Sequence, residues 1–194
     1  RAWVKERDDE VKYKMEVNYK KINMIEDGTI TTPKGFMADG VFSGVKKKRL
    51  DLGAIYCEVP ASSAACYTLN KIQAAPLKVT QESIAKEGKL RAIIVNSGNA
   101  NACTGTKGLE DAYEMRRVGS EHFSVPEHQV AVTSTGVIGE FLKMDKIVEG
   151  ISKLNVSSGV EGATNFNEAI LTTDTVQKHA CFQTEIDGVT ITVG

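Results

Sequence analysis

A run of hydroxyl residues and glycine follows a β-branched segment, and it carries the most specific chemistry in the chain. Residues 130–139 read VAVTSTGVIG, so the expected strand ends at Ser134, Thr135 and Gly136 with no proline or bulky side chain. A glycine N–H and an adjacent threonine hydroxyl aimed at one point can stabilise the anion of a tetrahedral intermediate. Thr135 and Gly136 are therefore a candidate oxyanion hole. Considered locally, Ser-Thr-Gly after a strand is more often an ordinary turn.

A second pair of hydroxyls lies at an expected helix-to-strand junction. Thr172 and Thr173 stand between Leu171 and Asp174. Such hydroxyls either bind the polar head of a substrate or satisfy loop amides, and the local residues favour the structural role.

Residues 96–108 form a small, polar segment with several glycines, NSGNANACTGTKG. Its end superficially resembles a nucleotide-binding loop. The Walker spacing from glycine to lysine is absent, however, and no serine or threonine follows Lys107. Close packing is the favoured explanation, with left-handed backbone at Asn and Gly and with side-chain amides that join neighbouring loops.

These segments need a framework of strands and helices to position them. The apolar run 90–96 predicts a central strand buried on both faces, and 53–59 predicts another strand. Two hairpins are expected around Asp-Gly turns, one at Asp27-Gly28 and one at Asp187-Gly188. Helices are expected at 83–87, ended by Gly88, at 109–118 and within 141–154, where Asp145 begins the helix; 74–79 is assigned to a strand or loop.

Composition limits the class of protein. The chain has 194 residues, of which 41% are hydrophobic, which fits one domain with a real core. A formal charge of -1 argues against a dedicated nucleic-acid binder. No apolar stretch has the length of about 20 residues that a membrane span needs, so a cytoplasmic protein is expected.

The four cysteines and three histidines lack zinc-ligand spacing, and the cysteines contain no C-x-x-C pair. Four unlinked, buried thiols in a reducing compartment are expected. Residues 1–20 differ from the rest by a mixed charge run, so we expect them to lie outside the folded domain of residues 21–194. A solvated first helix or an edge strand would have a similar composition.

Five motifs occur together in order, and together they are highly specific. They are residues 32–36 (TPKGF), 74–76 (AAP), 96–105 (NSGNANACTG), 134–139 (STGVIG) and 171–174 (LTTD). Over about residues 22–194 the chain resembles the α chain of the ArgJ family, the glutamate N-acetyltransferases that are also called ornithine acetyltransferases. The resemblance implies an α/β (α+β) fold, a layered αββα-type sandwich with mixed and antiparallel sheets, which is DmpA/ArgJ-like. The predicted hairpins and the buried central strand agree with this fold.

The resemblance also implies an activity. Family members are precursors that cut themselves before a threonine, and the resulting α and β chains stay associated, commonly as an α₂β₂ heterotetramer. The new N-terminal threonine takes the acetyl group from N-acetylornithine and passes it to glutamate. No metal or cofactor is expected. Whether acetyl-CoA is also used as a substrate is left open.

Carried over by motif, Thr135 and Gly136 correspond to the family's oxyanion-hole pair. Thr172 corresponds to a substrate-binding threonine, with Thr173 as second choice. The nucleophilic threonine, the lysine before the cut, and a later glutamate and asparagine are not in this chain, so we expect it to be inactive alone. The alternatives are an aminopeptidase or amidohydrolase of related fold with an N-terminal nucleophile, and a non-catalytic interaction subunit.

Overall fold

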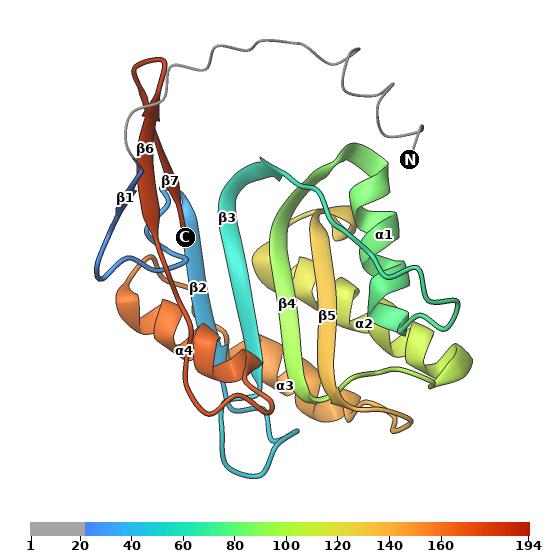
Figure 1. The fold of residues 1–194 in the computed structure, drawn as a ribbon. Coiled ribbons are helices and arrows are strands. Elements are labelled where there is room, and N and C mark those ends of the chain that lie inside the picture. The colour runs from blue at the N-terminus through green and yellow to red at the C-terminus, as the bar shows by residue number, and fades with distance from the viewer. Residues whose placement is uncertain (1–21) are drawn as a thin grey trace, which may run out of the picture.

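The computed structural model describes residues 22–194, which form two β-sheets and four α-helices (Figure 1). The charged segment 1–20 lies outside the described residues. The strands are β1 (Asn23–Met24), β2 (Phe36–Val41), β3 (Leu52–Ser62), β4 (Lys89–Asn99), β5 (Val130–Val137), β6 (Phe182–Ile186) and β7 (Val189–Val193). The helices are α1 (Ala75–Glu87), α2 (Gly105–Phe123), α3 (Met144–Lys153) and α4 (Val160–Ile170), with a 3₁₀ turn η1 (Glu127–Gln129). The predicted α/β (α+β) class with mixed and antiparallel sheets is confirmed.

The larger sheet has the strand order β2-β3-β4-β5. β2 and β3, and β3 and β4, are antiparallel, whereas β4 and β5 are parallel. Because parallel strands end at the same edge, the carboxyl ends of β4 and β5 meet there, at the bottom of the sheet in Figure 1. This edge holds both the Thr135 segment and the 96–108 segment.

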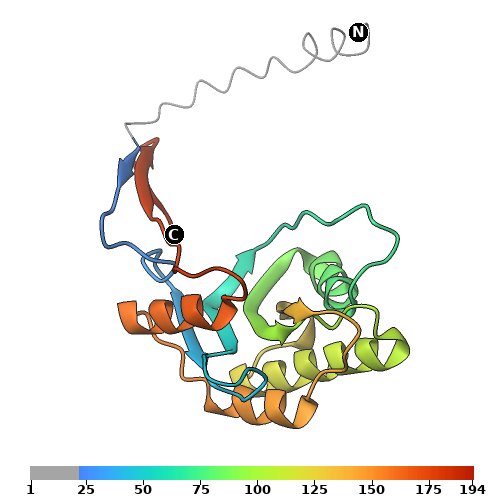
Figure 2. The same ribbon diagram turned by 60° about the horizontal axis from the view of Figure 1, so that its bottom comes forward.

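The central strand β4 is covered on both faces, as its continuous apolar run predicts. Ile94 packs in a core with residues of α1, α2 and α3, among them Val79, Met115 and Ile147. Val95 packs in a second core with Phe166 of α4. In Figure 2 the strands lie between α4 and the α1–α2 pair. The sheet is therefore sandwiched between helices, which explains why β4 has no polar face along 92–95.

Helix α1 corrects the prediction for residues 74–79, which form its start and not a strand or loop. Pro76 lies in the first turn, where its missing N–H costs no intrahelical hydrogen bond. The expected end at Gly88 is confirmed, because Gly88 adopts a left-handed conformation (φ 64°) and its N–H donates to the carbonyl of Ile84. The helices expected at 109–118 and within 141–154 are confirmed as α2 and α3, with Asp145 in the first turn of α3.

The smaller sheet has the order β1-β6-β7. The hairpin at Asp187-Gly188 is confirmed, with φ of 50° and 80° at these two residues. The hairpin predicted at Asp27-Gly28 is wrong, because β1 pairs with the distant β6. A Cβ on Gly28 would lie 2.3 Å from Cys181 Cβ, so glycine is required there for close packing.

The prediction of four unlinked, buried thiols is confirmed only in part. All four cysteines are free, and Cys57 and Cys181 are buried as expected. Cys66 and Cys103 are exposed, so burial was wrongly predicted for these two, which lie in loops. No helix among residues 22–194 is long and apolar enough to cross a membrane.

Candidate active site at the carboxyl ends of β4 and β5

The predicted oxyanion-hole residues lie at the end of β5, beside the end of β4. Thr135 is in register with Ser97, and Gly136 is in register with Gly98. Gly136 has a φ of 135°, and a Cβ built on it would lie 2.4 Å from the carbonyl carbon of Gly98. Only glycine fits this close approach of two backbones. Thr135 is half-buried and Gly136 is exposed, so a ligand has access to both.

Side-chain amides of the 96–108 segment hold this strand end in place. Asn96 is fully buried; its Oδ1 accepts from Ser134 Oγ at 2.5 Å, and its Nδ2 donates to the carbonyl of Asn99 at 2.9 Å. The Nδ2 of Asn99 donates to the carbonyls of Glu140 and Phe141, both at 3.1 Å. The segment therefore joins β4 to β5 and to the loop after it, as the prediction of packing amides requires.

Lys107 supports the same structural assignment. Its ammonium pairs with Asp111 one turn further along α2, and the hydrogen bond that it donates to this carboxylate raises the pKa of Lys107. The hydroxyl of Thr104 donates to Asn101 Oδ1 at 2.7 Å. The polar groups of Lys107 and Thr104 at the start of α2 are therefore engaged in contacts within the protein.

The loop between β2 and β3 is part of the site, and sequence reasoning missed it. The fully buried carboxylate of Asp51 accepts four hydrogen bonds from this loop: from Ser43 N (2.6 Å), Ser43 Oγ (2.8 Å), Gly44 N (3.1 Å) and Lys46 N (2.7 Å). Carboxylates that accept several backbone N–H bonds order a loop strongly. The only signal in the sequence is an aspartate that follows a basic run, VKKKRLD, and that pattern is not specific.

Lys46 connects this loop to both neighbouring elements. Its Nζ donates to the carbonyl of Leu171, just after α4, and to that of Leu50 at 3.3 Å. Its stem lies over the end of β4, since a Cβ on Gly98 would be 3.1 Å from Lys46 Cγ. Burial lowers the pKa of the Lys46 ammonium, and the charge of Asp51 partly opposes that shift.

Thr172 and Thr173 directly follow the anchored end of α4. The Oγ of Ser97 donates to the carbonyl of Ala169, so a second side chain from the sheet holds the same helix end. Both threonines are exposed, and neither hydroxyl makes a hydrogen bond within residues 22–194. The structure thus brings the Thr172 segment to the edge of the sheet that holds Gly136, with Lys46 between them.

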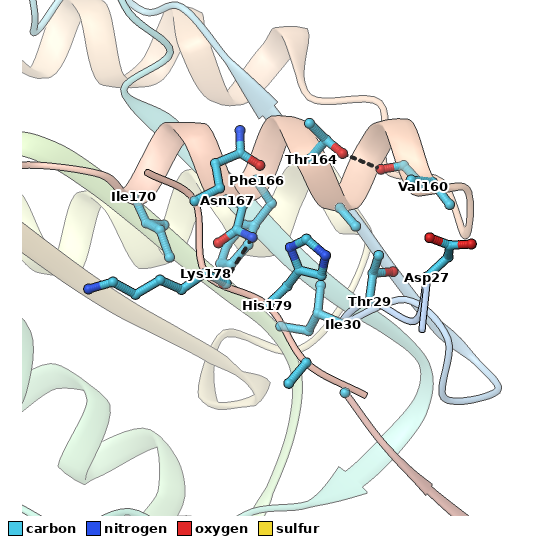
Figure 3. Close-up of a pocket in the computed structure, with 14 residues that line it drawn as sticks. Asp27, Thr29, Ile30, Val160, Thr164, Phe166, Asn167, Ile170, Lys178 and His179 are labelled. Atoms are coloured by element: carbon cyan, nitrogen blue, oxygen red, sulfur yellow. Dashed lines mark hydrogen bonds between the residues drawn. The ribbon is translucent and has the colours of Figure 1, made fainter. Parts of the chain in front are cut away.

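A separate pocket of about 390 Å³ lies along α4, between this helix and the segments 27–30 and 177–180 (Figure 3). Its lining includes the apolar residues Ile30, Phe166 and Ile170 and the polar residues Lys178 and His179. The Lys178 ammonium is 2.7 Å from Asp174 Oδ1, so it is already paired. None of the four predicted site residues lines this pocket. The strand-end site is therefore distinct from this cavity.

The strand-end groups suit stabilisation and binding of a reacting group. A carboxylate or imidazole that is hydrogen-bonded to a hydroxyl can activate it as a nucleophile. Among residues 22–194, no such group is hydrogen-bonded to Thr135, Thr172 or Thr173. Within the same described range, no cluster of His, Cys, Asp and Glu could hold a metal ion. The arrangement can supply hydroxyl and backbone donors to an anion.

Comparisons with known proteins identify relatives of most of the chain. The model of the ArgJ family matches residues 37–194. A protein of Halalkalibacterium halodurans described as "Arginine biosynthesis bifunctional protein ArgJ" is 69% identical over 170 residues, which are 88% of this chain and 41% of that protein. A protein of Geobacillus stearothermophilus with the same description is 56% identical over 90% of this chain and 42% of its own length. The chain thus spans about two fifths of the length of the curated relatives it matches.

Two solved structures share the fold. The crystal structure of arginine biosynthesis bifunctional protein ArgJ from Bacillus halodurans has a TM-score of 0.89 and 67% identity, and the match covers 91% of this chain and 92% of that chain. The structure of ornithine acetyltransferase from Mycobacterium tuberculosis, complexed with ornithine, has a TM-score of 0.77 and 34% identity over 89% of this chain and 93% of that chain.

Proposed function

The chain belongs to the ArgJ family, and we propose that it is the α chain of a two-chain glutamate N-acetyltransferase that moves acetyl from N-acetylornithine to glutamate. The observation that carries this proposal is the end of β5, where Thr135 and Gly136 are accessible and the Gly98–Gly136 contact fixes the backbone. An accessible glycine next to a threonine at a fixed strand end supports the proposal that these two residues donate to a tetrahedral oxyanion. Thr172 is proposed to bind the substrate, with Thr173 as second choice.

The lengths of the relatives support a division into two chains. The match covers 92% of the crystallised Bacillus halodurans chain but only 41% of the Halalkalibacterium halodurans protein. A chain of about the present length therefore exists as a separate polypeptide in the solved structure, while its curated relatives are more than twice as long. We propose that the partner is a β chain from the same precursor and that the assembly is an α₂β₂ heterotetramer.

The first half of the proposed reaction forms an acetyl-enzyme. The hydroxyl of the N-terminal threonine of the β chain attacks the acetyl carbonyl of N-acetylornithine, and its proton passes to its own α-amine. An α-amine has an ordinary pKa of about 7.7–8.0, so it can act as base near neutrality. The Gly136 N–H and the Thr135 hydroxyl stabilise the oxyanion. The C–N bond then breaks, the α-ammonium gives its proton to the leaving amine, and ornithine departs.

The second half reverses these steps with a new nucleophile. The α-amine of glutamate attacks the acetyl-threonine ester and gives one proton to the α-amine of the threonine, while the same two donors stabilise the second oxyanion. The ester C–O bond then breaks, the α-ammonium returns this proton to the threonine oxygen, and N-acetylglutamate leaves. Each proton and each acetyl group is accounted for without a metal or a cofactor. Acetyl-CoA as a second acetyl donor is tested by substituting it for N-acetylornithine.

The decisive assay measures products of the complete gene product. With N-acetylornithine and glutamate together we expect equimolar ornithine and N-acetylglutamate, and parallel lines in double-reciprocal plots, which indicate ping-pong kinetics. Release of acetate or cleavage of peptides without glutamate acetylation would instead indicate the hydrolase. No turnover of either kind by a correctly processed two-chain protein would indicate a non-catalytic subunit and overturn the proposal.

A further inference from the structure

The side chain of Lys46 contacts both halves of the strand-end site, the end of β4 and the chain after α4. Its stem lies against Gly98, the register partner of Gly136, and its ammonium donates to the carbonyl of Leu171, the residue before Thr172. No motif of the sequence analysis included it.

The backbone of Lys46 is anchored to the sheet by hydrogen bonds through Asp51. Its backbone N–H donates to Asp51 Oδ2 at 2.7 Å, and the carbonyl of Asp51 accepts from the N–H of Ser97 at 2.8 Å on β4. The base of the lysine is therefore fixed to the sheet. A fixed base and an engaged tip leave the side chain little freedom, so it can define the distance between the strand end and the chain after α4.

The contact also has a favourable electrostatic basis. The last carbonyls of a helix carry partial negative charge and lack intrahelical donors, and a cation placed there stabilises the helix end. Lys46 places its ammonium next to the C-terminal end of α4, on the carbonyl of the C-cap residue Leu171, while the basic residues Lys47, Lys48 and Arg49 of the same run are exposed. The half-buried Lys46 is thus distinguished from its neighbours by its contacts.

From these contacts we infer that Lys46 is a positioning residue, which holds the Thr172 segment at the correct distance from the Thr135–Gly136 donor pair. The inference rests on the proposed function, since Thr172 has to bind the acetyl donor. It assigns Lys46 no contact with substrate and no proton transfer. Its effect on catalysis passes through Thr172.

The test is a double-mutant cycle in the complete gene product. Lys46→Met keeps most of the stem and removes the ammonium, and we expect KM for N-acetylornithine to rise about tenfold through misplacement of the binding segment. Thr172→Ala is expected to raise KM as well. If Lys46 acts through Thr172, the double variant has the KM of Thr172→Ala within about twofold, because the effects of coupled residues do not add.

Two further variants separate positioning from general stability. Lys46→Arg keeps a cationic donor and should restore KM to within about threefold of the wild type. Lys48→Met removes an exposed cation of the same run and should leave KM and kcat unchanged. If Lys46→Met does not accumulate as folded protein, Lys46→Gln takes its place in the cycle.

The outcomes distinguish the inference from the proposed function. Multiplicative KM effects in the double variant, or wild-type kinetics of Lys46→Met, would overturn the inference while the acetyl transfer of the wild type stands. A wild-type protein that is correctly processed but transfers no acetyl group would overturn the proposed function, and the inference with it.

Discussion

Replacing Thr135 with alanine is the cleanest test of the donor pair. In the structure the Thr135 hydroxyl makes no hydrogen bond within residues 22–194, so its removal breaks no bond of the free protein. The substitution also removes a methyl group from a half-buried side chain. At about 0.8 kcal/mol for a fully buried CH₂ group, half-burial corresponds to a loss of about 0.4 kcal/mol in the free energy of unfolding. The folded protein should therefore barely change.

The transition state should respond much more strongly. Loss of one oxyanion donor costs about 2.7–4 kcal/mol, equivalent to a fall of about 10² to 10³ in kcat. Steady-state transfer from N-acetylornithine to glutamate measures this fall, and thermal unfolding measures stability. Thr135→Ser, which keeps the hydroxyl, should retain most activity, and Thr133→Ala, an exposed position on the same strand, is the matched control. A kcat within threefold of the wild type for Thr135→Ala would refute the donor role.

Three further predictions concern the framework of the site. Gly136→Ala should destabilise the protein by about 2–5 kcal/mol, because the strained φ adds to overpacking against β4. Gly139→Ala, at a position with a φ of 83° and no atom within 4 Å of the added Cβ, should lower the stability by only about 1 kcal/mol. Urea unfolding compares the two variants. Asp51→Asn should lower the free energy of unfolding by about 2–4 kcal/mol and speed hydrogen exchange at the N–H groups of Gly44 and Lys46, since a side-chain amide cannot accept all four hydrogen bonds. Unchanged exchange rates would contradict the role of Asp51. Asn96→Ala should leave the Ser134 hydroxyl unpaired and cost about 1–3 kcal/mol, which the same urea series checks.

The parts of the fold that were predicted correctly depend on local sequence. The apolar run at 90–96 and the Asp187-Gly188 turn each contain their own signal, hydrophobic continuity in one and positive φ in the other. The same turn signal failed at Asp27-Gly28, because Gly28 is required for its packing against Cys181, a contact that no local pattern shows.

The site was predictable only in part, for the same reason. The motif at Thr135 and Gly136 follows a clear strand, and the structure places it at an accessible strand end. Lys46 was not foreseen, because its contact with Leu171 joins residues 125 positions apart. Nor do local residues show that a side chain at position 136 would meet the backbone of β4.

We propose that this chain stabilises an acyl transfer whose nucleophile is a threonine on a second chain. The most direct measurement is denaturing intact-mass analysis of the complete gene product after incubation with N-acetylornithine alone, with N-terminal sequencing of each species. We predict two chains, a second chain that begins with threonine and gains the mass of one acetyl group, and loss of that acetyl group when glutamate is added. A single uncut chain, or acetylation of the present chain in place of its partner, would contradict the account.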